Sequence, residues 1–288
     1  MERFYQIAGL RLRVEGADDE MYSDDGILAE YRTQPGPWHH SFRFALCDTL
    51  PEPEGECLFT DPGLRVYRQG SGRLTYFGSV EHSLDGAYMA VSRTGSDSQV
   101  LLERNPLYSR IYPKTVLRAM ELEHLLACHD TLLFHATFID VGGKAILFTA
   151  PSGVGKSTQA QLWCRHQGAE LVNGDRAGLQ WRDGGAYACG VPFSGSSDVR
   201  RNVTLPLAAI ICLSQAPENT VTRLTGLRAF REIWAGCTVH LWERTDMERA
   251  TQTVSRLLQS VPVYALACTP DPSAAAVLHQ QLTKEKVL

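Results

Sequence analysis

The stretch Ala150-Pro151-Ser152-Gly153-Val154-Gly155-Lys156-Ser157-Thr158 decides which fold we expect for this chain. It fits the pattern GxxxxGK followed by Ser or Thr, with Ala150 in place of the first glycine. The β-like run KAILFT precedes it, and a helix is expected from about Lys156 to His166. A strand, a glycine turn and a helix in that order are typical of a phosphate-binding loop.

Each part of this pattern suits a triphosphate. Glycines at 153 and 155 let backbone N–H groups converge on phosphate oxygens, and the N-terminus of the helix adds its positive dipole end. Lys156 supplies a cation for the β and γ phosphates, and the Ser157 hydroxyl can bind Mg²⁺. We predict that the ATP-binding residues are Ser152, Gly153, Val154, Gly155, Lys156, Ser157 and Thr158. Two alternatives stay open: a glycine turn that only caps a helix, and a loop that binds phosphate without chemistry.

A phosphate-binding loop alone does not choose between a kinase, a GTPase and a motor ATPase. A GTPase needs a base-recognition segment of the NKxD type, and none of the five lysines lies in one. A motor ATPase usually carries four apolar residues followed by Asp, whereas the nearest candidate, residues 170–175, is much less apolar. Asp175 also lies only about twenty residues after the loop, where a carboxylate can help to hold magnesium. The sequence therefore favours neither a GTPase nor a motor ATPase.

Further elements around the loop match a known family. They are Phe134-His135-Ala136, Ser152 to Ser157, Gly174-Asp175-Arg176 and the turn Gly190 to Gly195. Together they resemble the HPr kinase/phosphorylase group of bacterial serine kinases, whose P-loop domain is related to that of phosphoenolpyruvate carboxykinase. The match is closest to shorter kinase-like relatives, some of them associated with modification of small peptides. It covers roughly residues 134–213 and extends weakly to Cys268.

The resemblance implies a magnesium-dependent kinase that moves the γ-phosphoryl group of ATP to a hydroxyl, expected to be a Ser or Thr of a peptide or protein. Asp175 aligns with the second of two adjacent aspartates of the family, the one given the metal role together with Ser157. Gly174 stands where the family has the first, proton-accepting aspartate. His135 is the leading substitute, because neutral imidazole can accept a proton near pH 7.

Three arginines complete the predicted site. Arg176 can touch phosphate or brace Asp175, and Arg200 or Arg201 can offset charge on the transferring phosphoryl group. Adjacent arginines usually point apart, so at most one of the pair is expected to act. The predicted catalytic residues are therefore His135, Lys156, Asp175, Arg200 and Arg201.

Two other functions remain as alternatives. One is a kinase for a free hydroxy amino acid or another small alcohol. The other is a nucleotide-binding sensor or accessory protein that has lost its catalytic base, which Gly174 favours. A phosphoenolpyruvate carboxykinase is less favoured, because the chain is short and lacks matching second-metal and oxaloacetate-binding elements.

The chain is expected to be of the mixed α+β or α/β class in two parts. From Phe4 to Arg104, short β-like runs separated by Gly, Pro, Asp and Ser predict an antiparallel sheet module. With a boundary near residue 112, residues 1–112 form a β-rich substrate-recognition or accessory module. Residues 113–288 form a P-loop kinase-like domain, in which helices pack on a mixed sheet. A helix is predicted over residues 114–129 and a hairpin at Gly142-Gly143.

The composition of the chain limits the binding partners and the cellular compartment that we expect. Lys plus Arg total 28 against 32 Asp plus Glu, a net charge of −4 without blocks of like charge, so nucleic acid and anionic membranes are disfavoured. The longest uncharged stretch, residues 202–217, is broken by Pro206 and reads as a buried strand. We expect no signal peptide, and the eight widely spaced cysteines without a CxxC pair favour reduced thiols in the cytoplasm. The related kinases assemble into oligomers. The resemblance therefore implies that this chain can form a homo-oligomer, without specifying its size.

The histidines outside the loop region give no metal motif. His39-His40, and His124 with His129, lack companion carboxylates at metal-ligand spacing. We therefore expect them to be structural or surface residues.

Overall fold

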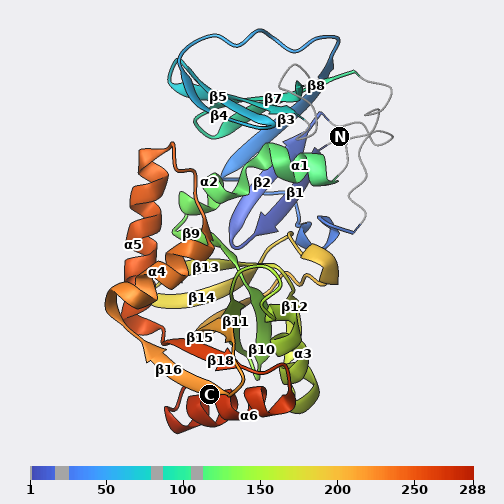
Figure 1. The fold of residues 1–288 in the computed structure, drawn as a ribbon. Helices are drawn as coiled ribbons and strands as arrows, with labels where there is room; N and C mark the ends of the chain where they lie inside the picture. The colour runs from blue at the N-terminus through green and yellow to red at the C-terminus, as the bar shows by residue number, and fades with distance from the viewer. Residues whose placement is uncertain (1, 17–25, 79–86, 105–112) are drawn as a thin grey trace. The chain divides into compact units, whose positions relative to one another are not determined.

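The computed structural model describes residues 2–16, 26–78, 87–104 and 113–288 of the 288-residue chain. It divides into two compact units, Met1–Leu122 and Glu123–Leu288. The described residues form a mixed α/β structure with two mixed sheets and six α-helices, in agreement with the predicted class (Figure 1). The boundary predicted near residue 112 falls outside the described residues. No described helix combines the length and the apolar character needed to cross a lipid bilayer.

The first unit is built on an eight-stranded sheet in the order β1-β2-β3-β8-β7-β6-β5-β4. Its strands are β1 (Glu2–Ile7), β2 (Leu10–Glu15), β3 (His40–Cys47), β4 (Cys57–Asp61), β5 (Leu64–Gln69), β6 (Gly72–Gly78), β7 (Ala87–Thr94) and β8 (Asp97–Glu103). The predicted antiparallel module is partly wrong, because β3 pairs in parallel with both β2 and β8. Long connections separate these strands in sequence, and such connections permit parallel pairing that a short turn does not.

The helix predicted over residues 114–129 is interrupted. Helix α1 (Pro113–Met120) ends at Glu121, whose φ of 45° breaks the helical backbone before α2 (Leu122–Ala127). The buried Glu121 carboxylate lies 3.3 Å from Arg73 Nη2 and 3.1 Å from Arg93 Nη2. A buried carboxylate must be paired, and these ion pairs hold the chain in the bend.

The second unit contains ten further strands and most of the helical structure. Its strands are β9 (Thr131–His135), β10 (Thr137–Val141), β11 (Lys144–Thr149), β12 (Glu170–Asn173), β13 (Arg176–Arg182), β14 (Gly185–Gly190), β15 (Thr204–Gln215), β16 (Thr220–Leu224), β17 (Cys237–Thr238) and β18 (Val263–Cys268). Its helices are α3 (Lys156–His166), α4 (Gly226–Gly236), α5 (Arg244–Ser260) and α6 (Pro272–Lys284), in addition to α2. The hairpin predicted at Gly142-Gly143 joins β10 to β11 and is confirmed.

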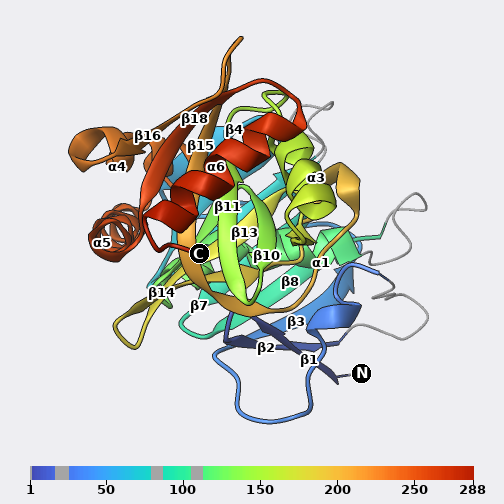
Figure 2. The ribbon, with the colours of Figure 1, turned by 90° about the horizontal axis from the view of Figure 1, so that it is seen from below.

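Strand β15 lies within the uncharged run of residues 202–217, and its central part is buried on both faces. Ile210 packs into one hydrophobic core with α4 and α5, and Ile211 packs into another with α3 and α6. Figure 2 shows α3 and α6 together, away from α4 and α5. Successive side chains of a strand point to opposite faces of the sheet. Because helices cover both faces here, the side chains on both faces are buried, and the strand has few polar residues.

The carboxyl ends of three parallel strands meet at one edge of this sheet. Strand β15 pairs in parallel with β11 on one side and with β18 on the other. The 150–158 loop follows β11 directly. Open α/β sheets place their ligands beyond the carboxyl ends of parallel strands, so this edge is where a binding site is expected.

Candidate functional site

The 150–158 loop has the strand–turn–helix context that its sequence predicts. Gly153 has a φ of 80° and Gly155, at the N-cap of α3, a φ of 126°, both in the region that favours glycine. Ser152, Gly153, Ser157 and Thr158 are exposed. The first N–H groups of a helix have no partner within the helix, so the turn presents backbone donors and hydroxyls to a ligand.

Lys156 is held inside the loop. Its Nζ donates hydrogen bonds to the carbonyl oxygens of Ala150 at 2.9 Å and Pro151 at 3.3 Å. Burial lowers the pKa of Lys156, and the negative charge of Asp175 raises it in part. The ammonium group is therefore placed at the loop and within the electrostatic range of Asp175.

His135 lies at the end of β9, and Asp175 lies in the turn between β12 and β13. His135 ends β9 and pairs in register with Arg176, the first residue of β13. The His135 Nε2 atom is 3.6 Å from Asp175 Oδ1. Burial and the charge of Lys156 lower the pKa of His135, against an opposing effect of Asp175. A lowered pKa keeps this imidazole neutral near pH 7, next to a carboxylate.

The turn that carries Asp175 is fixed by Asn173, which the sequence reasoning did not single out. Asn173 is fully buried, and its Oδ1 accepts hydrogen bonds from the backbone N–H groups of Asp175 at 2.9 Å and Arg176 at 3.0 Å. Its Nδ2 donates to the carbonyl oxygen of Val191 at 2.9 Å. An Asn side chain often accepts a hydrogen bond from the backbone N–H group two residues further along the chain. The order Asn-Gly-Asp is therefore the sequence feature that indicates this turn.

A tight contact explains the glycine at 174. A Cβ atom added to Gly174 would lie 2.1 Å from Ser197 Oγ and 2.6 Å from Ser197 Cβ. A Cβ atom added to Gly195 would lie 2.8 Å from the Cβ of Asp175. The short helix η4 (Gly195–Ser197) therefore packs on the turn between β12 and β13 and leaves no room for a side chain at 174.

The three predicted arginines have different surroundings. Arg176 Nε lies 3.6 Å from Asp175 Oδ2, and its Nη1 donates to Thr238 Oγ1 at 2.7 Å. The buried Arg200 bonds Asp198 Oδ1 at 2.6 Å through Nη2 and braces the segment after η4. Arg201 Nη1 donates to Glu170 Oε2 at 2.7 Å. Of these three arginines, Arg176 is the one that forms an ion pair with Asp175 within the described residues.

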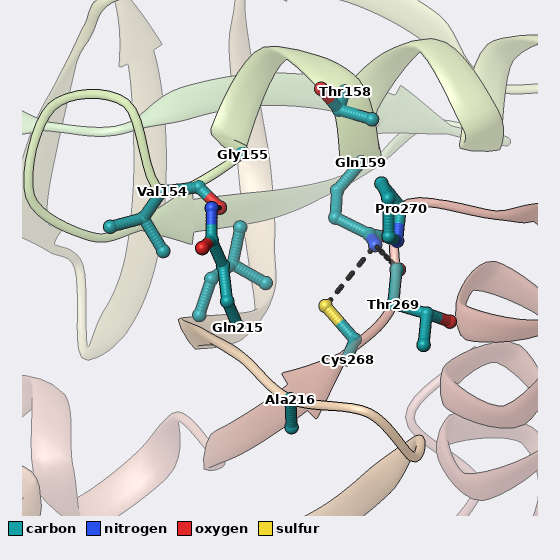
Figure 3. A pocket seen from close by; sticks show the side chains of 10 residues that line it. Val154, Gly155, Thr158, Gln159, Gln215, Ala216, Cys268, Thr269 and Pro270 are labelled. Atoms are coloured by element: carbon teal, nitrogen blue, oxygen red, sulfur yellow. Dashed lines mark hydrogen bonds between the residues drawn. The ribbon is translucent and has the colours of Figure 1, made fainter.

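A pocket opens beside the loop, between α3 and the ends of β15 and β18 (Figure 3). Its volume is about 230 Å³. Its lining residues are Val154, Gly155, Thr158, Gln159, Leu213, Gln215, Ala216, Cys268, Thr269 and Pro270. Gln159 is 2% exposed, and its Nε2 donates to Cys268 Sγ at 3.3 Å. Its Oε1 is buried with no hydrogen-bond partner among the described residues.

The histidines outside the loop are only partly as expected. His40 is buried and shares a hydrogen bond of 2.9 Å with Ser98 Oγ, which fits a structural residue. His124, however, does have a companion carboxylate, because its Nδ1 lies 2.7 Å from Asp246 Oδ2. This carboxylate was not evident from the sequence because the two residues are 122 positions apart. Local spacing does not reveal such a pair.

Comparisons with known proteins find likeness among solved structures. No family model and no curated protein sequence matches this chain. Among solved structures, the chain is similar to the Hpr(Ser) kinase/phosphatase from Coxiella burnetii, with a TM-score of 0.31 and 13% sequence identity. The likeness covers 54% of this chain and 96% of that chain. It is too distant to assign an activity.

Proposed function

We propose that this chain is a magnesium-dependent ATP phosphotransferase that moves the γ-phosphoryl group to a hydroxyl acceptor. The observation that carries the proposal is the convergence of three chemically distinct groups at one place. His135 at the end of β9 and Asp175 after β12 are 3.6 Å apart, and Lys156 at the start of α3 influences the pKa of His135. A lone glycine turn that caps a helix would not need a cation, a carboxylate and an imidazole together.

The loop residues suit the phosphates. The backbone N–H groups at the start of α3 and the Lys156 ammonium would bind the β and γ phosphates. The exposed Ser157 hydroxyl and the Asp175 carboxylate are oxygen donors of the kind that Mg²⁺ prefers, so the donor set fits the ion. Bound magnesium would neutralise charge on these phosphates. Lys156 would exchange its bonds to Ala150 and Pro151 for bonds to phosphate oxygens.

His135 would handle the proton of the acceptor. As a neutral imidazole it would accept the proton from the attacking hydroxyl, and Asp175 would stabilise the imidazolium that results. Arg176, 3.6 Å from Asp175, would hold that carboxylate in place. Phosphoryl transfer with a loose transition state needs little help from a base, which makes the absence of a carboxylate at position 174 tolerable.

The pocket beside the loop would take the nucleobase. Gln159 Oε1 is a buried acceptor without a hydrogen-bond partner in the described part of the chain. Adenine and guanine both carry N–H groups that can donate to such an acceptor, so this atom does not by itself choose between ATP and GTP.

The acceptor class rests on the sequence resemblance. It points to a Ser or Thr hydroxyl of a peptide or protein, and residues 1–112 would supply substrate recognition or an accessory function. A free hydroxy amino acid or another small alcohol is the alternative acceptor. The assignments of Arg200 and Arg201 as charge-offsetting groups remain predictions.

A second candidate is a nucleotide-binding sensor without efficient chemistry. Gly174 favours it, because Ser197 occupies the space that a side chain at 174 would need. A sensor would bind Mg²⁺-ATP through the same loop but would transfer no phosphate.

The decisive experiment measures ADP formation from Mg²⁺-ATP with Ser- and Thr-containing peptides and with free serine or threonine. We expect acceptor-stimulated turnover that is lost in Lys156→Ala and Asp175→Asn. Phosphate found on the peptide by mass spectrometry would establish the peptide acceptor, and phosphate on the free amino acid the small-molecule alternative. Nucleotide binding without turnover for every acceptor would replace the kinase with the sensor.

A further inference from the structure

A second cluster of chemically active side chains lies within the Glu123–Leu288 unit and shares no residue with the proposed kinase site. His124 belongs to α2, His240 to the segment between β17 and α5, and Asp246 to the first turn of α5. One ligand atom from each of the three residues lies within 4.8 Å of the others. His240 is 6% exposed and Asp246 1% exposed. Two imidazoles and a carboxylate thus converge in the interior.

The distances between the ligand atoms suit a small ion. His124 Nδ1 lies 2.7 Å and His240 Nδ1 lies 3.6 Å from Asp246 Oδ2. Ligand atoms at the usual zinc distances of about 2.0–2.1 Å, in tetrahedral geometry, are separated by about 3.3 Å from one another. The two observed separations lie on either side of that value.

Two buried atoms of the cluster have unmet hydrogen-bonding capacity. His240 Nδ1 and Asp246 Oδ1 are buried and make no hydrogen bond within the described residues. Arg249 Nη1 lies 3.6 Å from that Oδ1 but does not satisfy it with a hydrogen bond. Unpaired polar atoms in the interior are costly, and both of these atoms are acceptors of the kind that a cation binds.

The protonation pattern of His240 follows from Glu123. His240 Nε2 lies 3.1 Å from Glu123 Oε1, and an ionised carboxylate can only accept a hydrogen bond. The proton of a neutral His240 is therefore on Nε2, and the lone pair on Nδ1 faces the carboxylate of Asp246. Two acceptors that face each other repel unless a proton or a metal ion lies between them. Metal-bound histidines commonly donate the other ring N–H to a carboxylate in this way.

Ring stacking fixes the orientation of the two imidazoles. The rings of His124 and His240 are stacked, with centroids 6.0 Å apart and an interplanar angle of 9°. On His240, the ring of Trp242 is also stacked, at 4.5 Å and 19°. The donor atoms are thereby held in place before an ion binds, which lowers the entropic cost of binding.

We propose that His124 Nδ1, His240 Nδ1 and the Asp246 carboxylate bind one divalent transition-metal ion, with Zn²⁺ the best match. Imidazole nitrogens with a single carboxylate suit zinc, whereas Mg²⁺ prefers oxygen ligands. The ion would join α2 to the start of α5, elements that are far apart in the sequence, and its role would be structural. The alternative is a doubly protonated His240 that pairs with Asp246 without a metal.

The test measures binding of Zn²⁺ alone, and of Co²⁺ alone as a spectroscopic probe, to the full chain after treatment with a chelator. We expect one zinc ion per chain, a rise in the melting temperature with zinc concentration, and a visible Co²⁺ absorption band typical of tetrahedral nitrogen and oxygen ligands. His240→Gln and His124→Gln should abolish all three. Glu123→Gln, which changes only the residue that orients His240, should weaken zinc binding by about 10- to 100-fold.

Matched controls separate the cluster from adventitious binding. His166→Gln removes an exposed histidine at the end of α3 and should bind zinc as the original chain does. Circular dichroism of the zinc-free variants establishes that they fold, and Asp246→Asn provides a second ligand variant if either histidine variant does not. Absence of zinc binding by the original chain overturns the proposal, as does undiminished binding by His240→Gln. The readouts do not involve ATP, so the result is independent of the proposed kinase activity.

Discussion

The Nε2 atom of His135 lies 3.6 Å from Oδ1 of Asp175, the residue just before β13, and β13 pairs with the strand that His135 ends. The backbone reinforces this placement, because the N–H group of Ala136 donates to the carbonyl oxygen of Asp175 at 3.0 Å. Strand pairing thus holds the imidazole of His135 close to the carboxylate of Asp175, although the two residues are forty positions apart in the sequence. The pH behaviour of the chain follows from this arrangement.

We expect the phosphotransfer rate to fall in acid as His135 becomes protonated. His135 must be neutral to accept a proton, and burial, with the charge of Lys156, lowers its pKa below the ordinary 6.5. The acid limb of kcat/KM should therefore lie below pH 6.5. His135→Gln should reduce the rate by about 100-fold and remove that limb. A pH profile measured with saturating magnesium tests this, and an unchanged limb in His135→Gln would assign the titration to another group.

We expect a carboxylate at position 174 to be tolerated only when residue 197 is made smaller. Gly174→Asp places a Cβ atom 2.1 Å from Ser197 Oγ, an overlap that should cost about 1–3 kcal/mol of stability. Gly174→Asp with Ser197→Gly should recover most of that loss, which thermal unfolding of both single variants and the double variant measures. Additive effects of the two substitutions would show that the contact does not limit position 174.

We expect the buried carboxylate of Glu121 to contribute much more to the free energy of unfolding than the exposed carboxylate of Glu56. Glu121→Gln removes the buried negative charge that pairs with Arg73 and Arg93 and should cost about 3–5 kcal/mol. The matched control is Glu56→Gln, which removes an exposed ion pair with Arg68 and should cost at most about 1 kcal/mol. Urea unfolding followed by circular dichroism compares them. Equal midpoints for the two variants would contradict the role given to Glu121.

The sequence predicts the elements that depend on local patterns. The strand KAILFT, the glycine turn and the helix that starts at Lys156 are all present, because each is specified by neighbouring residues. The pairing of β3 with β2 and β8 could not be predicted in the same way, because parallel partners are joined through long connections. The break at Glu121 likewise depends on arginines from distant strands.

The same distinction applies to the side chains of the sites. The family resemblance groups His135 with Lys156 and Asp175, and the structure brings the three together. The order Asn-Gly-Asp indicates the local bonds from Asn173 to the next turn, but its burial and its hydrogen bond to Val191 depend on the folded chain and were missed. The cluster of His124, His240 and Asp246 was missed because its members come from separate segments and meet only in the folded chain.

Equilibrium binding of Mg²⁺-ATP tests the central claim most directly. The original chain should bind the nucleotide, and Lys156→Ala should bind it roughly 10- to 100-fold more weakly, because it loses charged hydrogen bonds to the phosphates. Lys144→Ala is the matched control, since Lys144 lies at the opposite end of β11 and bonds the carbonyl oxygen of Val287. It should bind as the original chain does. Equal affinities for the original chain and Lys156→Ala, or no binding by the original chain, would contradict the account.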